Sequence, residues 1–294
     1  MSMSSPQNPA HPNADDIPVV RTITLLQPLQ WLALAWRDMA HCGWISFAHG
    51  LMLSLIGAFI LFAAHDRFWV LAGAFSGFLI VAPVLATSLY ALSRALERHE
   101  KADARLVVRT WLNWQKSHRS KLGNDYWCIV QFGALLALAG TGWVLTSAAF
   151  ITLFSPQAVN SPTDFIRYVM LAEKGFVFES WLILGGLLAA PMFASSAVAI
   201  PLLLDRRVTI MQAVLTSWRT VLANPLPMAF WAALIMGFTF LGLASALLGL
   251  IAIVPMLGHA SWHAYRDLVD VTGLPERASV SEPNNTSSAA KETR

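Results

Sequence analysis

Charged residues are scarce in this 294-residue sequence: they make up 13% of it, whereas 56% of the residues are hydrophobic. A soluble globular chain has about a quarter of its residues charged. The hydrophobic residues stand in long runs and do not alternate with polar ones, which excludes the strands of a membrane barrel. A helix needs roughly 20 apolar residues to cross a bilayer core about 30 Å thick. Several runs reach that length, so the sequence predicts an all-α integral membrane protein.

Signatures of catalysis and of secretion are also missing. The two cysteines, Cys42 and Cys128, fall near predicted cytoplasmic helix ends, where neither a disulfide nor a metal motif is expected. Residues 1–20 are polar and contain four prolines, unlike a signal peptide. The sequence has no phosphate-binding loop, nucleophile elbow, HExxH motif or paired intramembrane carboxylates. It therefore favours a protein that is not an enzyme and that holds no cofactor.

The chain divides into a disordered tail over residues 1–24, a membrane domain over 25–270 and a second disordered tail over 271–294. A proline after a capping serine, Ser161-Pro162-Thr163-Asp164, predicts a short helix in the outer loop. The stretch 227–268 is too long for one crossing at about 1.5 Å per residue. Two crossings with a tight turn between Gly242 and Gly249 are favoured over one long kinked helix. Six crossings result, over residues 44–64, 68–93, 127–154, 176–204, 227–243 and 245–268.

The distribution of positive charge supports this count. With six crossings, 17 of the 20 lysines and arginines lie on the side of the N-terminus, whereas five crossings would leave 13 there. The positive-inside rule places that side, and with it both termini, in the cytoplasm. The cationic segment 94–121 contains interleaved apolar residues. It is expected to lie on anionic lipid at the cytoplasmic face, or to set the topology only; nucleic acid is not an expected partner.

The second, fourth and sixth predicted crossings share a pattern of a proline followed four residues later by a polar residue. A surface segment with tryptophan precedes the first, third and fifth crossings. The pattern therefore predicts three repeats, each made of a surface helix and a hairpin of two crossings. A helical proline frees a carbonyl that needs a hydrogen-bond partner. These residues either pack three kinked helices together or line a central cavity, as in transporters. The pairs are Pro83 with Thr87, Pro191 with Ser195, and Pro255 with His259.

Three histidines are the candidates for a metal site. His259 and His263 lie four residues apart and share a helix face. His49, on the first crossing, is expected at a comparable depth. Neutral imidazoles can bind a metal, or they can form hydrogen bonds between helices. Nine residues from the end of its helix, His259 is expected about 14 Å below that end and facing other helices.

Part of the sequence resembles a bacterial family of predicted integral membrane proteins, domain of unknown function 2189. The residues that carry the likeness are Pro201-Leu-Leu-Leu-Asp205-Arg206-Arg207, Ala223-Asn224-Pro225 and the run from Gly258 to Leu268. The likeness extends over about residues 25–270. It implies an inner-membrane protein and brings no established activity with it.

Three functions follow from these patterns. The first is a non-catalytic accessory or scaffold module with membrane-protein partners. The second is a transporter or channel for a small solute or an ion, with a cavity between the kinked helices. The third, an enzyme acting on lipid or metal, rests on the histidines alone.

Overall fold

The structure, a computed structural model, describes residues 17–64, 67, 69–74, 86–117, 127–172 and 176–277. Its described residues are almost entirely helical, which confirms the predicted all-α class. The elements in chain order are β1 (Val19–Val20), α1 (Gln27–Cys42), α2 (Trp44–Ala63), α4 (Thr87–Glu97), α5 (Ala104–Ser117), α6 (Trp127–Phe154), α7 (Pro162–Phe165), the π-helical η1 (Ile166–Met170), α8 (Val177–Ser196), α9 (Ala199–Asp205), α10 (Ile210–Ala223), α11 (Pro225–Ala244), α12 (Leu250–Leu268) and β2 (Val269–Asp270).

Four helices in the described part of the chain are long and apolar enough to cross a membrane. They are α2, α6, α8 together with α9, and α11, with mean hydropathies between 1.8 and 2.1. The sixth predicted crossing, α12, is not among them because its second half is polar, ending in Arg266 and Asp267. Much of the second predicted crossing, with Pro83, lies outside the described residues. The number of crossings therefore stays a prediction.

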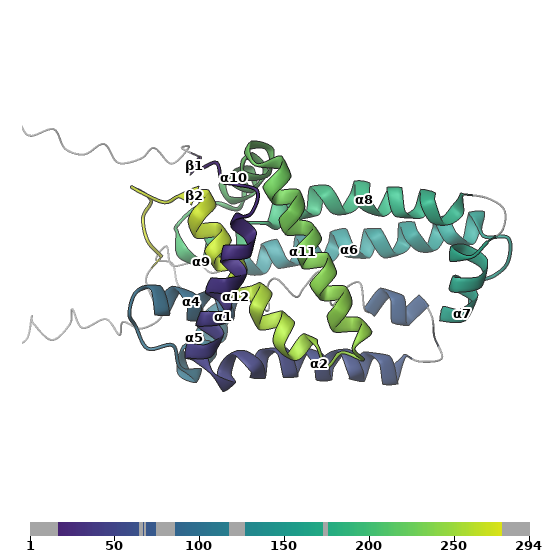
Figure 1. Cartoon of the computed structure of the whole chain (residues 1–294), viewed down its shortest axis with the longest axis horizontal. Coiled ribbons are helices and arrows are strands. Elements are labelled where there is room, and N and C mark those ends of the chain that lie inside the picture. The colour runs from purple at the N-terminus through teal and green to yellow at the C-terminus, as the bar shows by residue number, and fades with distance from the viewer. Residues whose placement is uncertain are drawn as a thin grey trace, which may run out of the picture.

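The apolar helices turn large hydrophobic side chains outward. Phe59 and Phe62 of α2 are 68% and 79% exposed, and Phe240 of α11 is 69% exposed. Such side chains on one surface suit contact with acyl chains and not with water. Figure 1 shows α6 and α8 running side by side to the end of the molecule where α7 lies.

The packed core lies at the opposite end, in a compact unit that we call the cap. The cap comprises α1, α4, α9, α10, the second half of α12, and residues 17–24 and 269–277. Trp31 of α1 and Trp231 of α11 meet edge to face with ring centroids 5.5 Å apart, and both are fully buried. Trp262 and Tyr265 of α12 are buried in the same core. Helix α12 is central, since it packs against α1, α2, α4 and α11.

The two ends of the described chain meet in the cap. Strand β1 pairs antiparallel with β2, with Val19 opposite Asp270, and Arg21 forms an ion pair with Asp270 at 3.2 Å. The two ends of the described chain therefore lie side by side, as the predicted even number of crossings requires.

The same pairing corrects the predicted domain boundaries. Residues 17–24 and 271–277, expected in the tails, belong to the folded cap, since residues 19–20 add a strand and residues 274–277 bind α9. The rest of both tails lies outside the described residues.

Helix α12 runs alongside α2. It then continues beyond the first residue of α2 into the cap. The turn between Ala244 and Leu250 confirms the predicted break between two helices. Leu247 in this turn accepts a hydrogen bond from Ser54 of α2 at 3.0 Å. At the other end of α2, Ser46 contacts His259. His259 is thus level with the first turn of α2. His259 faces other helices, as expected, and its depth in the membrane stays a prediction.

Candidate functional site

His259 is the centre of a buried hydrogen-bond chain. Its side chain is fully buried, with Nε2 2.9 Å from the Ser46 hydroxyl and Nδ1 2.7 Å from the Ser93 hydroxyl. Ser93 donates its proton to Asp38 at 2.7 Å, so its oxygen must accept from the Nδ1–H of His259. Nε2 then accepts from Ser46. This assignment leaves His259 neutral, with both ring nitrogens satisfied.

Asp38 of α1 ends the chain as a carboxylate. Its Oδ2 accepts from Ser93 and from Nε2 of His263, which is 2.9 Å away. Burial acts to raise the pKa of this carboxyl, but the hydrogen bonds from His263 and Ser93 outweigh burial and the net pKa is lowered. Asp38 therefore holds a negative charge that two donors stabilise inside the cap.

His49 has partners of its own. Its Nδ1–H donates to the Ile45 carbonyl at 2.7 Å, and its Nε2 accepts from Ser88 at 2.8 Å. His49 and His259 thus bind different serines and do not share a hydrogen bond. The described residues contain no group of three or more His, Cys, Asp or Glu side chains placed to hold a metal ion. The metal hypothesis gains no support from this geometry.

The predicted proline and polar pairs are only partly placed. Pro191 and Pro255 lie inside α8 and α12, whereas Pro83 is outside the described residues. Thr87 is fully buried at the start of α4. Ser195 accepts a hydrogen bond from Trp218 of α10 at 2.9 Å. The serines that contact His259 are Ser46 and Ser93, from other helices. The triple repeat and the central cavity therefore stay predictions.

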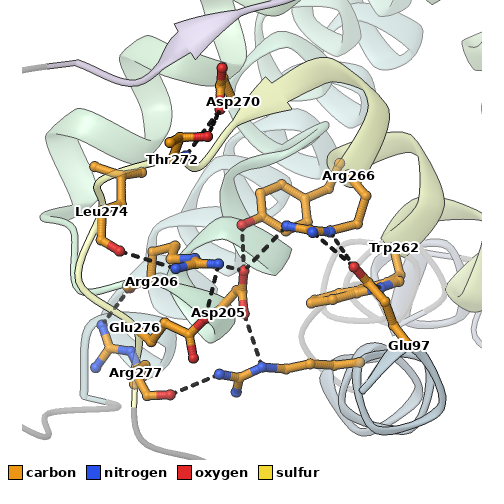
Figure 2. A network of polar contacts seen from close by, with 12 residues as sticks. Glu97, Asp205, Arg206, Trp262, Arg266, Asp270, Thr272, Leu274, Glu276 and Arg277 are labelled. Atoms are coloured by element: carbon orange, nitrogen blue, oxygen red, sulfur yellow. Dashed lines mark hydrogen bonds and ion pairs between the residues drawn. The ribbon is translucent and has the colours of Figure 1, made fainter. Parts of the chain in front are cut away.

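A second buried network surrounds Asp205, the last residue of α9 (Figure 2). The residue is 1% exposed. Arg94 lies 2.9 Å from its Oδ1, while Oδ2 accepts from the Tyr265 hydroxyl at 2.8 Å and from Nε of Arg206 at 3.0 Å. The backbone carbonyl of Asp205 accepts from the N–H of Arg277 at 2.9 Å. The carboxylate of Asp205 thus joins α9 to α4 and α12, and its backbone carbonyl joins α9 to the segment after β2.

Two more carboxylates extend this network to the surface. Glu97 of α4 pairs with Arg266 at 2.8 Å and accepts from the Trp262 indole at 3.0 Å. Glu276 pairs with Arg98 at 3.1 Å and with Arg206 at 3.3 Å. These acids and bases hold one another in place, and a buried carboxylate surrounded by guanidinium groups is a poor general base.

Sequence reasoning missed the Asp205 network. The arginines at 94, 98, 206 and 266 were interpreted as topology-setting charges and Asp205 as part of a family motif. The available signal was an acid followed directly by two arginines, Asp205-Arg206-Arg207, in a chain with few charges. Its partners lie far away in the sequence, 60 residues on in the case of Tyr265.

We predict that His259→Leu destabilises the protein by about 2 kcal/mol, because the buried Ser46 hydroxyl loses its acceptor. Unfolding of the purified protein in mixed micelles, followed by circular dichroism, measures this. His41→Leu is the matched control: His41 is exposed, and its replacement should change stability by less than about 0.5 kcal/mol. Equal stability of the two variants would show that the chain through His259 does not contribute to the fold.

Comparison with known proteins gives one match. Residues 70–205 match the model of a family described as a predicted integral membrane protein (DUF2189). The match confirms the predicted family, although it overlaps the residues on which the resemblance rests only at 201–205. No curated protein and no solved structure matches the chain.

Proposed function

From the premise that residues 70–205 belong to the DUF2189 family of integral membrane proteins, we propose that this protein is a non-catalytic accessory or scaffold module. We place it in the inner membrane of a bacterium, with the cap in the cytoplasm. The observation that carries the proposal is the buried network around Asp205, which joins distant segments of the chain in one rigid unit. A scaffold needs a fixed shape, whereas a catalyst needs groups free to react.

The outer surface of the cap supports a role in binding. Trp36 of α1 is 62% exposed, and Met211 and Leu222 of α10 are 66% and 72% exposed. These side chains flank a folded cap and are available to a partner in or on the membrane. The buried acids Asp38 and Asp205, in contrast, are already engaged by donors of the same chain.

A native gel of the gently solubilised protein tests the proposal. The wild type should migrate in a complex with other membrane proteins, and Asp205→Ala, which loosens the cap, should abolish that complex. His41→Leu, an exposed substitution, should leave the complex intact. A chain that migrates alone from its own membranes, in every variant, would overturn the scaffold proposal.

A second candidate is movement of protons, favoured by the run of hydrogen bonds from Ser46 through His259 and Ser93 to Asp38. His259 and Ser93 each accept from one neighbour and donate to the next, as the inner members of a proton relay must. The run ends at Asp38, which also accepts from the half-buried His263. A flux measurement separates this candidate from the scaffold.

Reporter fusions test the topology. The described cap contains Arg21, Arg94, Arg98, Arg206, Arg266 and Arg277, whereas Arg167 lies at the far end in η1. We predict that a phosphatase active only outside the cytoplasm is inactive when fused after residue 294 and active when inserted after Gln157. A fluorescent protein that folds only in the cytoplasm should give the opposite pattern. Phosphatase activity at residue 294 would contradict the topology.

A further inference from the structure

A hollow of about 180 Å³ lies between α2 and α5 on the surface of the molecule. Its lining is almost wholly apolar, and the rings of His49 and Trp111 in that lining meet edge to face with centroids 6.4 Å apart. Trp44, at the start of α2, is 72% exposed beside it. The lining residues are Trp44, Ile45, Ala48, His49, Met52, Ala104, Val107, Val108 and Trp111.

This hollow continues in two directions through shared lining residues. Ala48 and Met52 also line a larger hollow of about 410 Å³ along α2, which extends to Phe59 and is apolar throughout. Ala104 and Val108 also line a hollow beside Arg105 and Arg109 of α5. The three hollows form one track, which we call the α2–α5 groove, with two arginines at one end and an apolar channel at the other.

The apolar part has the length of one membrane leaflet. Ala48 and Phe59 are separated by 11 residues on a continuous helix, or about 16 Å at 1.5 Å per residue. Half of a hydrocarbon core about 30 Å thick is about 15 Å. The channel begins one turn after Trp44, whose exposed ring suits the level of the lipid headgroups.

The charged end is suited to a phosphate group. Arg105 and Arg109 are exposed and lie four residues apart, so they share a face of α5. Neither forms an ion pair with an acid among the described residues, and two like charges at this spacing repel each other. An anion between them removes that repulsion, and guanidinium groups bind phosphate oxygens in pairs. The other face of α5 is fixed by Leu106 and Val107, which pack against the cluster around Leu89 and Leu92.

We propose that the α2–α5 groove binds one anionic phospholipid, with its phosphate at Arg105 and Arg109 and an acyl chain along α2 from Ala48 to Phe59. The inference rests on the proposed membrane location of the protein and on the predicted position of segment 94–121 on anionic lipid, and it narrows that general attraction to a defined site. Lipid phosphate is favoured over free phosphate because only a lipid also fills the apolar channel.

Native mass spectrometry of the full-length protein, titrated with phosphatidylglycerol and with phosphatidylcholine, tests the site. The first bound phosphatidylglycerol should bind about tenfold more weakly or worse to Arg105→Gln/Arg109→Gln, since each basic residue contributes about a factor of five near an anionic headgroup. Ala48→Trp, which fills the channel, should weaken binding similarly. Phosphatidylcholine should show no such preference for the site.

Matched controls separate the site from general effects. Arg37→Gln/Arg219→Gln removes two exposed arginines elsewhere, and Ala58→Trp adds the same ring to α2 outside the groove lining. Both controls should bind as the wild type does. Equal loss in the controls and the groove variants, or no loss in either, would overturn the site. Loss in the arginine variant with none in Ala48→Trp would also overturn it, since contact with the headgroup alone then explains the binding. The titration measures lipid binding to the purified protein and does not depend on the complex seen on a native gel. The lipid site and the scaffold function can therefore fail independently.

Discussion

Asp205→Ala is expected to destabilise the protein by about 3–5 kcal/mol, the range for removing one partner of a buried ion pair. The change leaves Arg94 and Arg206 buried around a site that no longer carries a negative charge, and it removes the acceptor of the Tyr265 hydroxyl. The arginines keep their positive charge, because a guanidinium group is not deprotonated in a protein. Unfolding in mixed micelles, monitored by circular dichroism, should show the largest loss among the polar variants of the cap.

Glu276→Gln is the matched control for this prediction. Glu276 belongs to the same network and pairs with Arg98 and Arg206, but its side chain is 54% exposed. Pairs that reach solvent contribute about 0–1 kcal/mol, so this variant should remain close to the wild type. Equal stability of Asp205→Ala and Glu276→Gln would show that burial of Asp205 adds nothing to its contribution.

Gly50→Ala should have the second-largest effect, about 3 kcal/mol, in the upper range for overpacked contacts. A Cβ at position 50 would meet the backbone carbonyl of Ile251 on α12. A backbone atom cannot rotate away as a side chain can, so α2 and α12 would have to separate. Because Ser46 and Ser54 of α2 bind groups of α12 and of its preceding turn, the separation would also strain those hydrogen bonds.

Gly237→Ala provides the comparison within an apolar helix. Position 237 of α11 has open space where a Cβ would be added. Alanine should therefore be neutral there, or stabilising by up to about 1 kcal/mol through its helix propensity. Thermal unfolding of both variants in the same detergent measures the difference. A Gly50→Ala protein as stable as Gly237→Ala would mean that α2 and α12 do not pack as closely as the structure has them.

Features set by local patterns were predicted well from the sequence. Apolar runs identified α2, α6, α8 and α11, because the length of a membrane helix follows from the thickness of the bilayer. Ser161 accepts from the N–H of Asp164 and confirms the predicted helix start in the outer loop. The turn after Ala244 was also predicted, from the length of the stretch that contains it.

Features set by distant contacts were not predictable from those patterns. The position of His259 along α12 did not identify its partner, because Ser46 is 213 residues away. The positive-inside rule predicts the side of the membrane on which Arg94 and Arg206 lie. It does not predict that both side chains contact Asp205. The pairing of β1 with β2 involves two residues in each strand, too few for any periodicity.

Proton flux into vesicles tests the central claim, that the buried polar groups build a scaffold and do not conduct. Purified protein is reconstituted into liposomes that contain a pH-sensitive dye, and an acid pulse is applied outside with a potassium gradient and valinomycin to balance charge. We predict that wild-type, Asp38→Asn and empty liposomes acidify at the same rate. Faster acidification by the wild type, lost in a folded Asp38→Asn protein, would contradict it and establish the hydrogen-bond chain through His259 as a proton path.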